Sequence, residues 1–305
     1  MIKHITHREI DKKKWDVSIA NAGNSLIYAY SWYLDIVSPG WEALIEGDYQ
    51  TLMPLTLNKK YGIPYLYQPF FTQQLGIFSP ETLTENKTGA FLEALPPQFK
   101  LIEINLNTSN ETKNSAFYLR KNTSFKLNLA QPYSTIVQKY SENTKRNIKK
   151  AQKQGLVLRK NADPKKIIRL FRHNRGKKIE TLSGKHYLLL EKLLEELIKR
   201  DAVQILSVET ANKELSAGAF FIESGVNAVF LFSGSDEGSR ENGAMFYLID
   251  RFISENAQRL YTLDFNGSNN PNLARFYSGF GSLPQTYSQI RKNNLPWLIR
   301  WLKKH

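Results

Sequence analysis

A glycine-rich turn lies between a strand-like run that ends at Phe232 and a helix-like run that begins at Met245. A turn between a strand and a helix leaves backbone N–H groups free at the helix N-terminus, where they and the helix dipole bind phosphate. A plain surface turn is consistent with the same residues. The predicted contacts to a phosphate-bearing ligand in this turn are Ser233, Gly234, Arg240, Asn242, Gly243 and Ala244.

Two side chains further along the chain are candidates for proton transfer. Asp264 ends an apolar run, and its carboxylate could accept a proton from an amine. Capping of the turn at 266–269 is the commoner role for such an Asp. Tyr277 lies between Phe276 and Phe280, so its phenol is either a proton donor or part of an aromatic core.

Positive charge is concentrated in one segment. The 305 residues carry a formal net charge of +14, and residues 139–178 contribute +13 of it, with fifteen Lys and Arg against two acids. Such a block predicts a polyanionic partner: RNA, nucleotide phosphates or an anionic membrane surface. A solvated face that only aids solubility explains it equally well. Arg146 and Lys149 are its candidates for substrate phosphate contacts, or are plain surface cations.

The composition excludes several kinds of site. The chain contains no Cys, which rules out disulfides, thiolate zinc sites, iron–sulfur centres and a cysteine nucleophile. Its five His residues show no HExxH spacing, so we expect no metal. The N-terminus lacks an apolar signal core, and no apolar run approaches about 18 residues. We therefore expect a cytoplasmic protein, with peripheral attachment to the inner membrane surface left open.

Helix-like and strand-like runs alternate in both halves of the chain, which predicts an α/β fold with mixed sheets. The polar, turn-rich segment 107–122 suggests a boundary between domains at 1–124 and 125–305. In the second domain, a helix is expected from a cap at Ser141 or Asn143 to Gln154, with Gly155 as its stop. From Val203 the order is three strands, a loop, a helix, a strand, a loop, a helix and a strand. A basic helix is expected over 295–304.

This order of elements and two motifs resemble the GCN5-related N-acetyltransferase (GNAT) superfamily. Residues 240–245, Arg-Glu-Asn-Gly-Ala-Met, are similar to its R/Q-x-x-G-x-G/A pyrophosphate loop, except that Met245 replaces the last small residue. Asn270 and Tyr277 keep the seven-residue spacing of its N-x-x-A-x-x-x-Y-x-x-x-G segment, and Gly281 follows. The resemblance implies acyl-CoA as co-substrate, Asn270 and the turn as its binding residues, and Tyr277 as the acid for the leaving thiolate.

Segments 141–155, 264–267 and 275–281 look more like the Fem family and its GNAT-like acyltransferase relatives. In the N-terminal half the likeness rests on Tyr-Leu-Tyr-Gln-Pro at 65–69 and Gln-Gln-Leu-Gly at 73–76. Fem proteins have two tandem GNAT-like domains and transfer amino acids from aminoacyl-tRNA to peptidoglycan precursors. The resemblance thus implies two tandem GNAT-like (acyl-CoA N-acyltransferase) domains, with the acceptor side in the first and the donor site in the second. Ser278 replaces a Lys of the Fem motif, which favours acyl-CoA over aminoacyl-tRNA.

Four further residues are candidates for binding the acceptor. Tyr65, Tyr67 and Gln68 could line the acceptor side from the first domain, and Tyr287 on the final strand could orient the substrate. Residues of these types on strands and turns are more often packing residues.

These observations together predict an N-acyltransferase that moves an acyl group from acyl-CoA to an amine acceptor, for example a cell-envelope precursor. One alternative is an aminoacyl-tRNA-dependent peptidyltransferase of the Fem type, with tRNA bound by residues 139–178. The other is a non-catalytic relative that binds RNA or a membrane surface. The basic block, Trp297, Trp301 and the departures at Met245 and Ser278 suggest this last reading.

Overall fold

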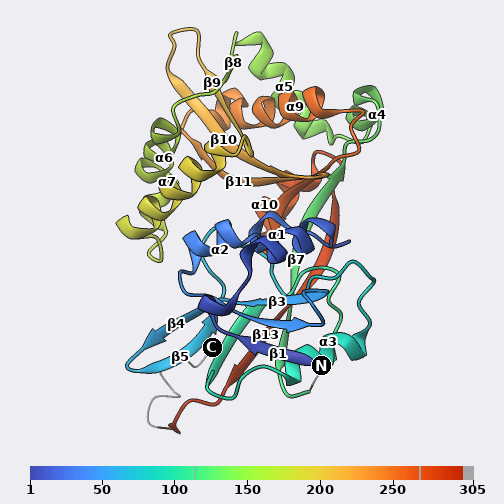
Figure 1. Cartoon of the computed structure of the whole chain (residues 1–305). Coiled ribbons are helices and arrows are strands. Elements are labelled where there is room, and N and C mark those ends of the chain that lie inside the picture. The colour runs from blue at the N-terminus through green and yellow to red at the C-terminus, as the bar shows by residue number, and fades with distance from the viewer. Residues whose placement is uncertain (114, 268, 298–305) are drawn as a thin grey trace. The chain divides into compact units, whose positions relative to one another are not determined.

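The computed structural model divides the chain into two compact units (Figure 1). It describes residues 1–113, 115–267 and 269–297, and the side chains of Lys178 and Arg240 lie outside this description. Unit 1 comprises Met1–Thr123 and Thr286–His305, and unit 2 comprises Ser124–Gln285. Unit 1 thus includes the end of the chain, which the sequence-based division at 124 and 125 assigned to the second domain. Most of the tail helix expected over 295–304 lies outside the described residues.

Unit 1 contains an antiparallel three-stranded sheet and part of a second sheet. Helix α1 begins after an Asp11 cap, whose carboxylate accepts hydrogen bonds from the N–H groups of Lys13 and Lys14. The first sheet has the strand order β1 (Ile2–Ile5), β2 (Glu42–Glu46), β3 (Thr51–Leu55). The part of the second sheet in this unit has the order β4 (Leu57–Lys60), β5 (Ile63–Tyr67), β6 (Leu101–Asn105), β13 (Leu283–Asn293). The helices are α1 (Lys12–Asn21), α2 (Ser31–Val37) and α3 (Glu85–Glu93).

Unit 2 is built on a mixed sheet in which β11 and β12 are parallel, whereas β7–β12, β11–β10, β10–β9 and β9–β8 are antiparallel pairs. The strand order is β7 (Tyr118–Asn128), β12 (Thr262–Gly267), β11 (Asn227–Ser235), β10 (Leu215–Ser224), β9 (Val203–Glu209), β8 (Val157–Lys160). The helices are α4 (Tyr133–Gln138), α5 (Glu142–Lys153), α6 (Pro164–His173), α7 (Gly184–Lys199), α8 (Ser239–Asn242), α9 (Ala244–Asn256) and α10 (Pro271–Ser278).

Two neighbouring residues of β10 identify the two faces of this sheet, because successive side chains of a strand point to opposite faces. Phe221 stacks on Phe252 of α9, with ring centroids 3.8 Å apart. Phe220 stacks on Phe232, whose ring lies 4.6 Å from that of Phe171 in α6. We call these the α9 face and the α6 face. Helix α5 packs on α9, and α7 packs on α6 (Figure 1).

The basic block is divided between these two faces. Ser141 caps α5 as expected, and Gly155 follows its end with a positive φ of 67°. Helix α5 packs on α9, whereas α6 packs on β10 and β11, so the cations of residues 139–178 are carried by helices on both faces of the sheet. The exposed cations of α5 are Arg146, Lys149, Lys150 and Lys153, and those of α6 are Lys165, Lys166, Arg169 and Arg172. In the described part of the chain, no helix is both long and apolar enough to span a bilayer.

Candidate functional site

The two parallel strands of unit 2 pair over only a short distance. The ladder runs from Asn227↔Thr262 to Val229↔Asp264 and then stops, although β11 continues to Ser235. Beyond Val229, no described residue of β11 pairs with β12. We call this opening the strand break. Past Val229, β11 therefore lacks the regular ladder with β12 among the described residues.

Strand β11 is also irregular on its other edge. Phe220 pairs with Phe232 and Phe221 with Phe230, so Leu231 has no partner on β10 and the strand bulges there. After the bulge, Leu231, Ser233 and Ser235 are partly exposed, whereas Phe232 and Gly234 are buried. Ser233, a predicted ligand contact, therefore lies on the accessible side of β11, next to the strand break.

Asn266 lies at the other side of the strand break. Its backbone is left-handed, with φ 61°. Its side-chain Nδ2 donates to the carbonyl of Phe230 at 3.0 Å, and its backbone N–H donates to Oδ1 of Asp264 at 2.9 Å. Asn266 thus connects the end of β12 to β11 across the opening.

Asp264 is buried, with 8% of its surface exposed. Its Oδ1 accepts hydrogen bonds from the Ser124 hydroxyl at 2.6 Å and from the Asn266 N–H. Burial raises the pKa of Asp264, and the charge of nearby Lys126 opposes this shift. No described residue donates to Oδ2. Asp264 therefore caps the turn, as the commoner reading predicted, and keeps one carboxylate oxygen free.

Tyr277 of α10 is packed among aromatic rings. Its ring stacks on Phe265 at a centroid distance of 5.1 Å and lies edge-on to Phe230 at 6.4 Å. Burial raises its pKa to about 12, and the positive charge of Arg175 opposes this shift. Its hydroxyl forms no hydrogen bond with described residues and is not among the buried unpartnered oxygens. Tyr277 is therefore a core aromatic residue, 9% exposed, whose hydroxyl is not completely buried.

The backbone amides of the glycine-rich turn are bonded within the turn itself. The N–H groups of Glu241 and Asn242 donate to the Gly238 carbonyl, and that of Gly243 donates to Ser239. The N–H of Ala244 donates to the Asn242 side chain at 2.9 Å. The next two N–H groups of α9, those of Met245 and Phe246, make no hydrogen bond with described residues. Of the described N–H groups from Glu241 to Phe246, these two are the ones left to meet a phosphate.

Two glycines of this region are required by packing. A Cβ built on Gly243, whose φ is 77°, would lie 2.4 Å from the Asn147 carbonyl oxygen of α5. A Cβ built on Gly234 would lie 2.6 Å from the Ile167 carbonyl oxygen of α6. Both positions therefore exclude larger residues without any ligand. Gly243 also brings α5 into contact with the turn.

The remaining predicted donor-site residues have varied environments. The backbone of Arg240 lies in α8, but its side chain is outside the described part. Asn270 is the N-cap of α10, and its side chain accepts from the N–H groups of Asn272 and Leu273. Arg146 and Lys149 are exposed on α5, and Arg146 donates to Asn143 at 2.9 Å.

The predicted acceptor residues lie in unit 1, and two of them have bonded side chains. The Gln68 amide donates to the Thr72 carbonyl at 2.7 Å and accepts from the Asn105 N–H at 2.9 Å, which ties β5 to β6. The Tyr67 hydroxyl donates to the Val37 carbonyl at 3.2 Å. Tyr65 is partly exposed, and Tyr287 is buried. Packing explains Gln68 and Tyr67 without a substrate.

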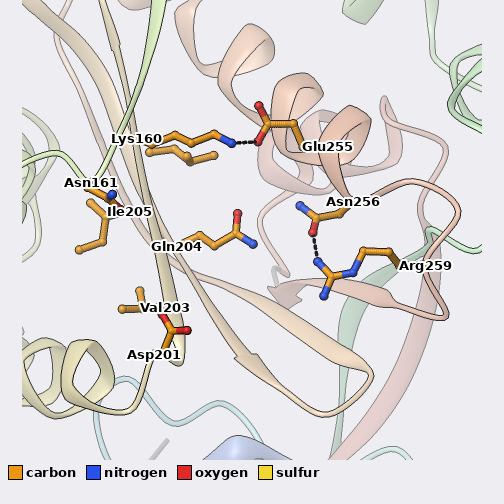
Figure 2. Close-up of a pocket in the computed structure, with 10 residues that line it drawn as sticks. Lys160, Asn161, Asp201, Val203, Gln204, Ile205, Glu255, Asn256 and Arg259 are labelled. Carbon is orange, nitrogen blue, oxygen red and sulfur yellow. Dashed lines mark hydrogen bonds and ion pairs between the residues drawn. The ribbon is translucent and has the colours of Figure 1, made fainter.

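A cavity of about 570 Å³ lies elsewhere in unit 2, between β8, β9 and the end of α9. Figure 2 shows the Lys160–Glu255 ion pair, 2.8 Å long, above it and Arg259 bonded to Asn256 beside it. No predicted site residue lines this cavity. Among the described residues, no cluster of three or more His, Asp or Glu is arranged to hold a metal.

Residues 138–272, which fall within unit 2, match the family model described as an acetyltransferase (GNAT) domain. This segment of the chain is therefore similar to a GNAT domain. The match covers the strand break, the glycine-rich turn and Asp264, and it ends before Tyr277. No curated protein matched the chain.

Solved structures show the Fem-like fold over nearly the whole chain. FemX has a TM-score of 0.61 at 11% identity and aligns with 99% of this chain and 100% of its own. The C-terminal domain of a putative lysylphosphatidylglycerol synthetase from Agrobacterium fabrum scores 0.54 at 8% identity, covering 96% and 94%. L-PGS from Bacillus licheniformis scores 0.51 at 10% identity, covering 96% and 95%. The expected α/β fold with tandem GNAT-like domains is confirmed.

Sequence reasoning did not identify Asn266 or Ser124 as site residues. Asn266 was assigned to a loop, although Asn before Gly commonly adopts the left-handed conformation seen here. Ser124 precedes Asp264 by 140 positions, so no local pattern connects them. The Asn-Gly pair was the only available signal for the strand break.

Proposed function

We propose that unit 2 transfers an acyl group to an amine acceptor and that the bonds change at the strand break. The supporting observation is the opening between β11 and β12. Tyr277 packs against Phe230 of β11 and Phe265 of β12, and Asp264 keeps one carboxylate oxygen without a donor among the described residues. Unpaired backbone N–H groups of β11 after Val229 suit an acyl carbonyl, because such donors stabilise the oxygen as it gains negative charge.

The proposed chemistry uses direct attack. The acceptor amine attacks the acyl carbonyl carbon, a C–N bond forms, and the bond to the leaving atom breaks. The free oxygen of Asp264 takes the proton that the amine loses, and Tyr277 gives a proton to the leaving atom. Since Cys is absent from the chain, no thioester to the protein forms on the way.

Acyl-CoA is the first candidate donor. Its thiolate would take the proton of Tyr277, and its phosphates would meet the free N–H groups of Met245 and Phe246 at the N-terminus of α9. Ser233 is partly exposed on β11, and Arg240 supplies a cation within the turn.

Aminoacyl-tRNA is the second candidate donor, and the hydrogen bonding within the glycine-rich turn favours it over acyl-CoA. The N–H groups of residues 241–244 are already bonded, which leaves little for a diphosphate to bind. Helix α5 contacts the turn at Gly243 and carries Arg146 and Lys149 on its exposed surface. A helix with such cations suits an extended phosphate backbone.

The proposal also includes the side of the protein that binds the acceptor amine. We assign the acceptor side to unit 1, where Tyr65 remains the candidate contact, with Tyr287 as a positioning residue. A cell-envelope precursor that carries an amine is the acceptor class we propose.

A thiol-release assay tests the donor. Since the protein has no Cys, a thiol-reactive dye reports only CoA set free from acyl-CoA. We expect amine-dependent thiol release, weakened in Arg240→Ala through a higher KM for the donor. If a panel of acyl-CoA donors gives no release while aminoacyl-tRNA is deacylated in the presence of an amine, the second donor is correct. If neither occurs with any amine, the proposed function is wrong.

A further inference from the structure

The position of Asn266 follows from the register of the strands that it joins. The N–H of Thr262 donates to the Val226 carbonyl at 2.9 Å. In a parallel ladder the bonds from one strand recur every second residue, so the N–H of Asp264 faces the Ala228 carbonyl and that of Asn266 faces the Phe230 carbonyl. The last of these bonds would close the strand break.

The structure has a different bond at this point. The Phe230 carbonyl accepts from the Asn266 side chain at 3.0 Å, and the Asn266 backbone N–H has turned to Asp264. A side-chain amide thus takes the place of a backbone amide in the ladder. Because the Asn266 backbone N–H is turned away, the regular pairing of the two strands ends here and the ladder does not close.

The same residue orients the carboxylate of Asp264. Its N–H and the Ser124 hydroxyl both bond Oδ1, which leaves Oδ2 as the oxygen that can take a proton. On the β11 side, the Phe230 ring contacts both Phe265 and Tyr277, at 6.3 and 6.4 Å. One residue is therefore bonded to Asp264 and to the residue that packs against Tyr277.

We propose that Asn266 is a positioning residue that holds β11 and β12 apart at the strand break and points the free oxygen of Asp264 into it. The role of Asp264 in catalysis rests on the proposed function, whereas the spacing of the strands does not. Asn suits the position because it tolerates a positive φ and supplies a side-chain donor.

The test compares Asn266→Gly with Asn161→Gly. Glycine keeps the left-handed backbone and removes only the side-chain amide. Asn161 also has a positive φ, 54°, and lies in unit 2 after β8, so its replacement controls for a glycine at a left-handed position. Amide hydrogen exchange of Phe230–Phe232, the carboxyl pKa of Asp264 by NMR, and kcat are measured for both variants and the wild type.

In Asn266→Gly we expect amide exchange at Phe230–Phe232 to rise about tenfold and kcat to fall about tenfold or more, because small misplacements of reacting groups are costly. The pKa of Asp264 should rise further, because the side-chain bond to Phe230 no longer fixes the Asn266 backbone N–H against Oδ1, whereas Lys126 is unchanged. Unchanged exchange and an unchanged Asp264 pKa, or equal changes in Asn161→Gly, would overturn the proposal. If the wild-type protein is inactive with every donor, the proposed function is refuted but the role of Asn266 in the strand spacing is not. Amide exchange and the pKa of Asp264 are measured without a substrate, so they still test that role.

Discussion

Asp264 and Tyr277 lie on opposite faces of β12. Phe265 points to the α9 face and stacks on Tyr277, with ring centroids 5.1 Å apart. Asp264 is the residue before it and points to the α6 face, where it bonds Ser124. The proposed proton acceptor and the proposed proton donor therefore lie on different sides of β12, so the proposed reaction needs no contact between the two side chains.

Replacement of Tyr277 by Phe should lower the chemical rate without affecting donor binding. The phenol supplies only a proton in the proposed reaction, and general acids of this kind contribute about 10²-fold or more. We expect kcat to fall by about that factor, while the donor Kd measured by calorimetry changes less than about twofold.

The matched control for this variant is Tyr261→Phe. Tyr261 is also buried in unit 2, and its hydroxyl has no partner in the described part of the chain. Its loss should leave kcat near the wild-type value. Equal losses in both variants would mean that Tyr277 serves packing alone.

The pH dependence of kcat/KM should report the ionisation of Asp264. Burial raises the pKa of this carboxyl above the ordinary Asp range, and only the ionised form accepts a proton. Activity should therefore rise with pH through the raised pKa, and Asp264→Asn should remove this acid limb together with most of the rate. An acid limb that persists in Asp264→Asn would assign the base to another group.

Asp264 should also make stability depend on pH. A carboxyl whose folded-state pKa is raised stabilises the fold fully below its unfolded pKa, and this contribution is lost as pH rises through the folded-state pKa. The free energy of unfolding of the wild type minus that of Asp264→Asn should therefore decrease as pH rises from about 4 to about 7. Urea denaturation across this range measures it, with Asp201→Asn as the control for loss of an exposed carboxylate. A difference that increases with pH would contradict the burial of the charge.

Charge-reversal variants of α5 and α6 distinguish the contributions that the two parts of the basic block make to tRNA binding. Lys149→Glu/Lys150→Glu changes α5, and Lys165→Glu/Lys166→Glu makes the same change in net charge on α6. If the donor is aminoacyl-tRNA, the α5 variant should weaken tRNA binding at low salt by about tenfold or more and flatten its salt dependence, with a smaller effect from α6. Filter binding at several salt concentrations measures this. Equal effects on both helices would indicate unspecific attraction.

The sequence predicts the fold well where the signals are local. The strand Val203–Glu209 and the α5 helix with its Ser141 cap were found with accurate bounds because alternation and capping are encoded in neighbouring residues. The GNAT motifs also led to the correct fold. At the short helix α8, by contrast, the sequence predicts a loop, because these four polar residues show no helical periodicity.

The roles of single residues were harder to predict where they depend on distant contacts. Gly234 was expected to approach a ligand, but it faces Ile167 of α6, which comes much earlier in the chain. Gln68 was expected at the acceptor, but it bonds Thr72 and Asn105. The turn resembles a phosphate loop, yet Asn242 bonds the Ala244 N–H that a phosphate would use. None of these contacts leaves a local pattern.

The location of the acyl group at the strand break is tested most directly by NMR with a non-cleavable donor analogue. S-acetonyl-CoA represents the thioester donor, and an amide-linked 3′-aminoacyl-adenosine represents the tRNA end. With the analogue of the true donor, we predict the largest ¹H–¹⁵N shifts at Leu231, Phe232 and Ser233, accompanied by a shift of Tyr277. Shifts confined to the cavity between Lys160 and Arg259, or none on β11 with either analogue, would contradict the account.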